Sequence, residues 1–336
     1  MPTNPTKNTR KLGSINYISG GRESLELDKN GVLMRLNLRL RFTVTNSATA
    51  PVTPLFQALA RLINRVDIMA GGRDTVQSIP GYMLAARAAY EQIGIPVRGM
   101  GAAVVTTASA VTNYDVTLPV DFMMPLGQRQ DDTALDTTGL TQLSCIVTWG
   151  KNDASDLFAT PNGAAISNVQ LDVEGEYIVN PQRSSTGMAV SSKTGKPYLV
   201  RAFDYQEIDI SASNTAFSTI LDSRSGLVVT SFLFVALADS QGNDSIINSM
   251  QIDAASFNFL NRDAEEIRAE NQRRLRLVNG PTPGMLYVDP RVGGSILNAI
   301  STGDLAGDLK ATLNVTTQGT VCKLAIQREA VRPLLM

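Results

Sequence analysis

The residue types best able to do chemistry are sparse in this sequence. None of its 336 residues is histidine, which excludes Ser-His-Asp and Cys-His nucleophilic catalysis, histidine general bases and histidine-ligated metals. The only cysteines are Cys145 and Cys322. They are too few for a conventional structural zinc site or a disulfide framework, and each lies in an apolar, β-like run. Carboxylate and lysine chemistry remain open.

Acidic residues gather in one polar loop of each half of the chain. They are Asp131, Asp132 and Asp136 in the first half, and Asp304 and Asp308 in the second. Carboxylate oxygens bind Ca²⁺, but these acids lack the tight D-x-D-x-D-G spacing of a calcium loop. We interpret them as solvated loop acids and expect no cofactor, with a structural Ca²⁺ as the weaker alternative.

A first basic group lies in residues 1–12, which are rich in Pro, Asn and Thr and contain no acid. Its members are Lys7, Arg10 and Lys11. We expect a flexible N-terminal tail here; alternatively, the tail orders against neighbouring subunits or an anionic surface. Together with a basic strand face at residues 36–44, these side chains could contact phospholipid head groups, at about 1 kcal/mol each.

A second basic group lies in a predicted helix at residues 264–277. Acids come early and arginines late, as the helix dipole prefers. The arginines are Arg268, Arg273, Arg274 and Arg276. We interpret this charged face as helix-stabilising pairs plus an inter-subunit contact rather than as a catalytic group.

Composition favours a soluble protein with real cores. Hydrophobic residues make up 43% and charged residues 18% of the chain, and the net charge is −1. A sequence-specific nucleic-acid-binding domain would be strongly basic. The N-terminus has no apolar core of a signal peptide, and no run approaches the roughly 18–20 apolar residues of a membrane-spanning helix. We therefore expect a protein made in a reducing compartment.

The elements that must position these groups are mostly strands. Residues 36–44 alternate apolar and polar side chains, which predicts a strand with one buried face. Residues 227–237 form a continuous apolar run rich in Val and Phe, which indicates a buried central strand. Residues 82–92 are rich in Ala, Leu and Met and predict a helix, as do residues 264–277.

Two halves share this order of elements: strands, a hairpin, a helix, a strand, a long polar loop and closing strands. We match the hairpin at Ile63 to that at Ile247, and the pair Leu25 and Leu27 to Ile208 and Ile210. Residues 181–197 are rich in Ser, Gly and Lys and predict a linker. The predicted domains are therefore residues 13–180 and residues 198–336. Each is expected to be an eight-stranded β-sandwich with one notable helix, so the fold class is mainly β, a double jelly roll.

Two stretches carry a resemblance to a known family: LINRVDIMAGGRDTVQSIPGYMLAARAAYEQ (residues 62–92) and IINSMQIDAASFNFLNRDAEEIRAENQRRL (residues 246–275). Their strand, turn, strand and helix resemble the double jelly-roll major capsid proteins of tailless icosahedral bacteriophages with an internal membrane, and most closely the P2-type coat protein of a membrane-containing marine phage. The likeness is one of pattern and spans roughly residues 14–330.

The resemblance implies a virion component and no enzyme. Three copies would form a pseudo-hexameric homotrimer, and such capsomers would tile an icosahedral shell over a lipid membrane. The implied partners are the chain itself in neighbouring capsomers, penton and minor capsid proteins, and the internal membrane, with no sequence-specific nucleic-acid binding. Assembly would take place in the cytoplasm of the host bacterium.

Two other hypotheses remain open. The first is a carbohydrate-binding or carbohydrate-cleaving β-sandwich, which would need aromatic platforms or a convergent carboxylate pair. The chain has a single tryptophan, Trp149, within a strand pattern, and 6% aromatic residues. The second is another virion part, such as a spike or minor capsid protein.

Overall fold

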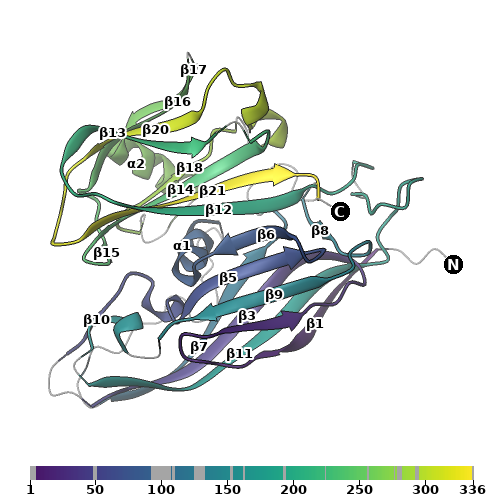
Figure 1. Ribbon diagram of the computed structural model, residues 1–336, viewed down its shortest axis with the longest axis horizontal. Coiled ribbons are helices and arrows are strands. Elements are labelled where there is room, and N and C mark those ends of the chain that lie inside the picture. Colours follow the sequence, from purple (N-terminus) through teal and green to yellow (C-terminus); the bar gives the residue numbers. More distant parts are fainter. Residues whose placement is uncertain are drawn as a thin grey trace. The chain divides into compact units, whose positions relative to one another are not determined.

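Strands dominate both halves of the chain (Figure 1). The computed structural model describes residues 5–47, 51–91, 107, 110–124, 133–151, 154–161, 163–191, 194–223, 225–255, 257–275, 277, 282–291 and 295–334. The chain divides into two compact units. The first runs as far as Arg201, and the second comprises mainly Ala202–Arg332.

The first unit contains two four-stranded antiparallel arrays. One has the order β1 (Thr6–Ile15), β11 (Ala164–Val179), β3 (Val32–Asn46) and β7 (Ala110–Asp121), with β8 (Leu135–Asp136) paired to β3. The other has the order β6 (Asp74–Ile79), β5 (Ile63–Ala70), β9 (Leu143–Trp149) and β2 (Arg22–Glu26). Short elements complete the unit: β4 (Thr53–Pro54), β10 (Phe158–Thr160) and the 3-10 turns Ala58–Ala60 and Ala154–Asp156.

The predicted alternation in the first unit is confirmed by β3. Leu36, Leu38 and Leu40 are fully buried, and the polar residues between them are partly exposed. Successive side chains of a strand point to opposite faces, so one face of the sheet contributes to the core and the other carries charge. This geometry places the basic side chains predicted at residues 36–44 on the charged face of the sheet.

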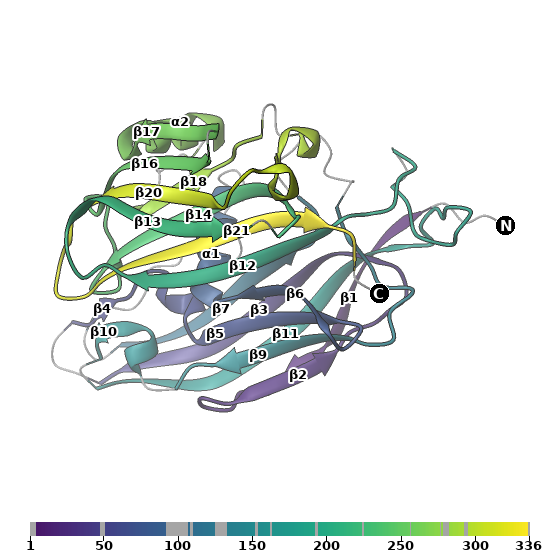
Figure 2. The same ribbon diagram turned by 45° about the horizontal axis from the view of Figure 1, so that its top comes forward.

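The second unit also contains two four-stranded antiparallel arrays (Figure 2). One has the order β12 (Val200–Asp209), β21 (Cys322–Arg332), β14 (Val228–Ala238) and β18 (Met285–Val288), with β15 (Gln241–Gly242) and β19 (Ile300–Ser301) also paired to β14. The other has the order β13 (Asn214–Asp222), β20 (Leu309–Val315), β16 (Ile247–Ala254) and β17 (Phe257–Asp263). The 3-10 turns are Ile296–Asn298 and Thr302–Asp304. As predicted for the apolar run, β14 is buried beyond its first residue.

The two units repeat one topology. In chain order, the first, eighth, third and sixth main strands of each unit make one array, and the second, seventh, fourth and fifth make the other. In both units a hairpin leads into a helix: β5 and β6 into α1 (Gly81–Glu91), and β16 and β17 into α2 (Ala264–Leu275). The predicted hairpin-and-helix repeat, and the double jelly-roll fold class, are therefore confirmed.

Part of the predicted match between the halves is wrong. Leu25 belongs to β2, the second strand of its unit, whereas Ile208 belongs to β12, the first strand of the other unit. The true counterpart of β2 is β13 (Asn214–Asp222), which begins only after Ile210. Local alternation looks the same in any half-buried strand, so it cannot identify topological position.

Two further predictions concern segments outside the regular core. The expected tail is not free, because residues from Thr6 onward form β1 and pair with β11. This strand has no apolar alternation, since it lies at a sheet edge and is held by backbone pairing and ion pairs. The expected linker, residues 181–197, belongs to the first unit and contains the bridges Arg183 to Ala189 and Val190 to Pro197.

Candidate interaction surfaces

The outer face of the array β1-β11-β3-β7 is a lattice of ion pairs. By register, the polar residues of four neighbouring strands share this face. Its basic members are Lys7, Lys11, Arg35, Arg39 and Arg41, and its acidic members are Asp115, Asp121, Asp172, Glu174 and Glu176. We call this set the outer-face lattice; its five positive charges equal its five negative ones.

The predicted basic residues of the tail are all engaged by acids of their own unit. Lys7 Nζ lies 2.6 Å from Glu176 Oε2, and Lys11 Nζ lies 2.8 Å from Asp172 Oδ1. Arg10 points elsewhere: its guanidinium lies 2.9 Å from Asp28 and 4.8 Å from the centre of the Tyr177 ring. The structure thus brings Lys7 and Lys11 into the lattice and gives Arg10 a separate stacking site.

The basic face predicted on residues 36–44 is also neutralised. Arg39 binds Asp115 through two nitrogens, Nε to Oδ1 at 2.9 Å and Nη2 to Oδ2 at 2.6 Å. Arg41 pairs with Asp172, and Arg35 with Asp121. The sequence analysis identified the arginines but did not predict these carboxylates, which come from other strands.

The ion pairs of the outer-face lattice lower the pKa of two of its acids, Asp172 and Glu176. Hydrogen bonds from Lys11 and Ser14, reinforced by the Lys11 and Arg41 charges, lower the pKa of Asp172 to about 2. Burial alone would raise the pKa of Glu176, but the hydrogen bond and charge of Lys7 outweigh burial and lower it. Both acids are therefore held in the charged form that their partners require.

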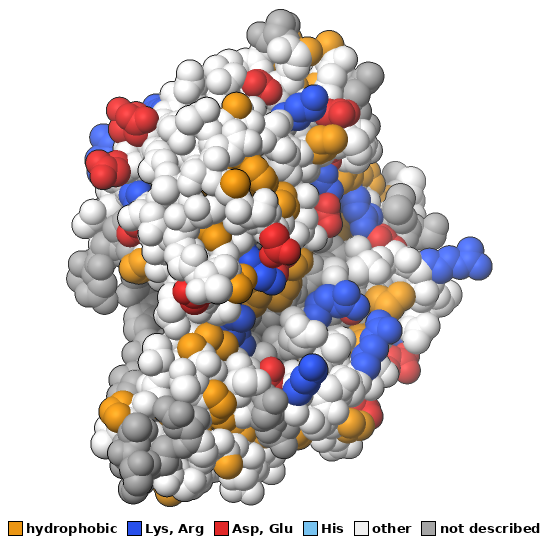
Figure 3. Space-filling view, turned by 60° about the vertical axis from the view of Figure 1, so that its left-hand side comes forward, with side chains coloured by type: hydrophobic (Ala, Val, Ile, Leu, Met, Phe, Trp, Pro, Cys, Tyr) orange, Lys and Arg blue, Asp and Glu red, His pale blue; other side chains and the backbone are white. Residues whose placement is uncertain are grey.

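This balance limits what the surface can attract. A cation already bound to a carboxylate contributes little to the binding of an anionic surface, because its field is largely cancelled. On the face drawn in Figure 3, acidic and basic side chains are likewise interspersed. The lattice is better suited to a neutral, hydrogen-bonding partner than to a strongly charged one.

The predicted arginine face of α2 is spread around the helix. At 3.6 residues per turn, Arg273 and Arg274 point roughly 140° and 240° away from Arg268. Arg268 Nε lies 2.9 Å from Asp244 Oδ1, and Arg274 Nη2 donates to Asp289 Oδ2 at 2.9 Å. Arg273 is exposed. Arg276 lies outside the described residues.

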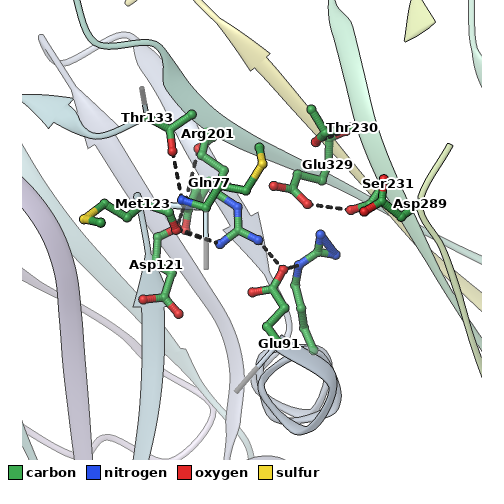
Figure 4. Close-up of polar contacts among 12 residues, drawn as sticks. Gln77, Glu91, Asp121, Met123, Thr133, Arg201, Thr230, Ser231, Asp289 and Glu329 are labelled. Atoms are coloured by element: carbon green, nitrogen blue, oxygen red, sulfur yellow. Dashed lines mark hydrogen bonds and ion pairs between the residues drawn. The ribbon is translucent and has the colours of Figure 1, made fainter. Parts of the chain in front are cut away.

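Sequence reasoning missed a buried charge cluster in the first unit (Figure 4). Arg201 is 1% exposed and pairs with Glu91 at the end of α1. Arg87, one helical turn earlier, donates to the same Glu91 oxygen at 2.9 Å. Arg201 also donates to the Asp121 carbonyl at 3.3 Å, and Gln77 donates to that carbonyl at 3.0 Å. We call these five residues the Arg201 cluster; the i, i+4 spacing of Arg87 and Glu91 was its only local signal.

The second unit has its own buried polar groups. The Ser231 hydroxyl donates to Glu329 Oε2 at 2.5 Å on neighbouring strands (Figure 4). Arg291 binds Asp289 through two nitrogens, at 2.8 and 2.7 Å, and both side chains are fully buried. Burial would lower the pKa of Arg291, but the hydrogen bond and charge of Asp289 raise it instead. Such pairs fix geometry because either member alone would be a costly buried charge.

The loop acids do not converge on one site. Asp136 accepts from the Thr138 hydroxyl at 2.7 Å and from the Ala189 amide at 2.9 Å. Asp304 and Asp308 lie in the second unit, and Asp131 and Asp132 fall outside the described residues. Across the described ranges, no group of three or more His, Cys, Asp or Glu residues could hold a metal ion.

Cys145 and Cys322 are buried free thiols, and burial raises the pKa of Cys145 to about 12.

The single tryptophan is not a sugar-binding platform. Trp149 is 1% exposed, and its indole nitrogen donates to the Asn16 carbonyl at 2.9 Å. Tyr17 packs edge to face against it at 5.1 Å. The carbohydrate hypothesis therefore loses its one candidate tryptophan surface.

Of the helices in the described part of the chain, none combines the length and apolarity needed to cross a membrane.

Paired eight-stranded sandwiches of this strand order define a double jelly roll. The chain is similar to the MCP of STIV, the Sulfolobus turreted icosahedral virus, with 14% identity, 97% of this chain and 96% of that chain covered, and a TM-score of 0.74. It is also similar to the Faustovirus major capsid protein (9% identity, 99% and 91% covered, TM-score 0.62). A third match is the major capsid protein P2 of bacteriophage PM2 (11% identity, 97% and 98% covered, TM-score 0.59).

These likenesses establish the fold. The resemblance to double jelly-roll major capsid proteins, predicted from the hairpin-and-helix repeat, is confirmed at that level. Among these three, the PM2 protein has the lowest TM-score, so the likeness does not single out the phage type. No family model matches the sequence, and no curated protein matches it.

Proposed function

We propose that this chain is a structural, non-enzymatic protein, the major capsid protein of an icosahedral virus. The observation that carries the proposal is the double jelly roll, which matches a viral MCP over 97% of this chain and 96% of the other. Nearly the whole chain is thus accounted for by a fold that capsid proteins in the comparisons share. The single tryptophan is buried, which weakens the carbohydrate-binding alternative.

In this proposal, three copies form a pseudo-hexameric capsomer, because three chains bring six jelly rolls of one topology. Neighbouring capsomers, penton proteins and minor capsid proteins are the further partners. The charge pattern supports close packing of copies: the net charge is −1, and the outer-face lattice neutralises itself. Weak self-repulsion permits dense assembly.

The finer part of the proposal is a bacteriophage whose capsid encloses a lipid membrane and is assembled in the bacterial cytoplasm. Within that setting, the lattice favours a neighbouring subunit over lipid head groups as the partner of β1, since Lys7 and Lys11 already bind acids. On α2, exposed Arg273 is the arginine best placed for an inter-subunit contact. Arg268 and Arg274 are held by acids of their own unit.

The test is the assembly state of the purified full-length protein. We expect light scattering to give three times the 36.1 kDa of one chain, and negative-stain electron microscopy to show particles with a hexagonal outline. A protein that remains monomeric at every concentration would contradict the proposal. Titration with anionic and zwitterionic vesicles tests the lipid question separately. Clear binding to anionic vesicles alone would overturn the preference for a protein neighbour of β1.

A further inference from the structure

Two arginines converge on one buried carboxylate on the array β6-β5-β9-β2 of the first unit. By register, Arg22 of β2 and Arg65 of β5 flank Thr148 of β9. Arg65 Nε lies 3.1 Å from Asp67 Oδ1, and Arg22 Nη2 lies 3.7 Å from Asp67 Oδ2. The Ser78 hydroxyl donates to the same acid at 2.7 Å. We call Arg22 and Arg65 the arginine pair; its two positive charges share a single negative one.

The arginine pair is accessible to a further acceptor. The side chains of Arg22 and Arg65 are 55% and 51% exposed, whereas that of Asp67 is 4% exposed. Arg22 is too far from Asp67 for a hydrogen bond, and Arg65 donates to it through Nε. Within the described part of the chain, the terminal nitrogens of both guanidiniums have no hydrogen-bond acceptor. Because these nitrogens form a planar fork that matches a carboxylate, the pair can bind a second acid.

The positive charge of this site is not cancelled by its neighbours, unlike that of the outer-face lattice. Glu26, further along the same face of β2, is paired with Lys29 at 3.3 Å, so these two residues add no net charge. Anionic membranes are recognised by clusters of about four to eight Lys or Arg residues. A surplus of one positive charge therefore suits a small acidic group on a protein better than a lipid surface.

The second unit carries acids with the opposite imbalance. Glu265 and Glu266, in the first turn of α2, are exposed, as is Asp263 at the end of β17. No cation in the described part of the chain pairs with any of the three. The helix dipole favours acids at this end of α2 but leaves their carboxylates accessible to water and to a partner.

We propose that the arginine pair of one copy binds the Glu265 and Glu266 carboxylates of a second copy. The inference rests on the proposed function, since it assigns one of the contacts through which copies assemble. Opposite charges at an interface favour the correct partner and orientation. Because the basic site lies in the first unit and the acidic site in the second, the contact is heterologous. Such contacts close into a ring when the rotation between copies permits, as three copies in a capsomer require.

The test is a double-mutant cycle on the assembly of the full-length protein, followed by light scattering over a concentration series. One variant combines Arg22→Gln and Arg65→Gln, the second combines Glu265→Gln and Glu266→Gln, and the third has all four changes. We expect each of the first two to raise the concentration needed for assembly about tenfold. The third should show the same tenfold rise and not the hundredfold rise of independent sites, because both pairs of changes break one contact.

A matched control combines Lys151→Gln and Lys310→Gln, two exposed positions that change the net charge as the arginine variant does. It should assemble as the unmodified protein does. Each variant is first checked for the native circular dichroism spectrum. If the unmodified protein forms trimers and the effects are additive or absent, the contact is overturned while the proposed function stands. An unmodified protein that never assembles contradicts both.

Vesicles of phosphatidylglycerol distinguish a lipid partner. We expect the arginine variant to bind them as the unmodified protein does. Loss of vesicle binding in that variant, with unchanged assembly, would assign the arginine pair to lipid head groups and overturn the proposal.

Discussion

The Arg201 cluster and the outer-face lattice are built from the same kinds of side chain in the same unit, yet they differ in burial. In the cluster, Arg201 and Glu91 are at most 4% exposed at their side chains. In the lattice, the side chains of Arg39 and Lys7 are 30% and 61% exposed. Asp121 belongs to both: its backbone carbonyl accepts from Arg201, and its carboxylate pairs with Arg35. Because burial leaves an unpaired charge without water, we expect water access, more than the number of ion pairs, to set what each charge contributes to stability.

The largest effect should come from breaking the buried cluster. Arg201→Met removes one of the two arginines that pair with Glu91, together with the hydrogen bonds that Arg201 donates to the Asp121 and Met123 carbonyls. Removing one member of an isolated buried pair costs about 3–5 kcal/mol, and we expect a loss at the lower end of that range because Arg87 still pairs with Glu91. Urea denaturation followed by circular dichroism measures the loss of unfolding free energy.

The matched control is Arg39→Met, which breaks a two-nitrogen pair on the lattice. Solvent-exposed pairs contribute little, so the loss of unfolding free energy should be much smaller than in Arg201→Met. A loss in Arg39→Met as large as that in Arg201→Met would show that burial is not the deciding variable. The comparison is valid only if both variants keep the native circular dichroism spectrum before urea is added.

An intermediate, pH-dependent effect is expected at Asp172. Its folded pKa of about 2 lies below the ordinary value of 3.8, so its pairing stabilises the folded state at higher pH. That contribution is fully present above about pH 4 and disappears as the pH falls toward 2. Lys11 and Arg41 are about half exposed, so we expect only about 1 kcal/mol after solvent screening.

The measurement compares the unmodified protein with Asp172→Asn in urea between pH 6 and pH 2. The difference in unfolding free energy should be largest at pH 6 and shrink as the acid becomes protonated. Asp263→Asn, at an exposed position ending β17, is the control and should show less than half the difference at pH 6. A difference for Asp172→Asn that stays constant over the whole range would contradict the assignment.

The distance along the chain between interacting residues explains what the sequence could predict. Alternation in β3, the apolar run of β14 and both helices depend on neighbours within a few residues, and these predictions agree with the structure to within a few residues. Polar β1 has no such signal, because its stability comes from β11, more than 150 positions away along the chain.

The sites were harder to predict for a related reason. Arg201 and Glu91 are 110 positions apart, and nothing near either residue indicates the other. Arginines at 36–44 were visible, but the carboxylates that neutralise them come from strands whose register is fixed only by the folded sheet. α1 and α2 occupy one topological position with opposite burial, so repetition of the fold did not carry over to surface chemistry.

The smallest expected effects distinguish two neighbours on β1. Lys7→Ala removes a single exposed pair, and we expect a loss of about 0.5 kcal/mol that disappears in 1 M NaCl. Arg10→Ala also removes the stacking of the guanidinium on Tyr177, worth about 0.5–1 kcal/mol, which salt screens less because it is partly apolar contact. Urea denaturation of both variants at low and high salt gives the loss of unfolding free energy in each condition. If both losses vanish equally in 1 M NaCl, Arg10 contributes only as a charge. A residual loss in Arg10→Ala alone would show that β1 is anchored to β11 by packing as well as by the lattice, and that the edge strand keeps its position where its ion pairs are screened.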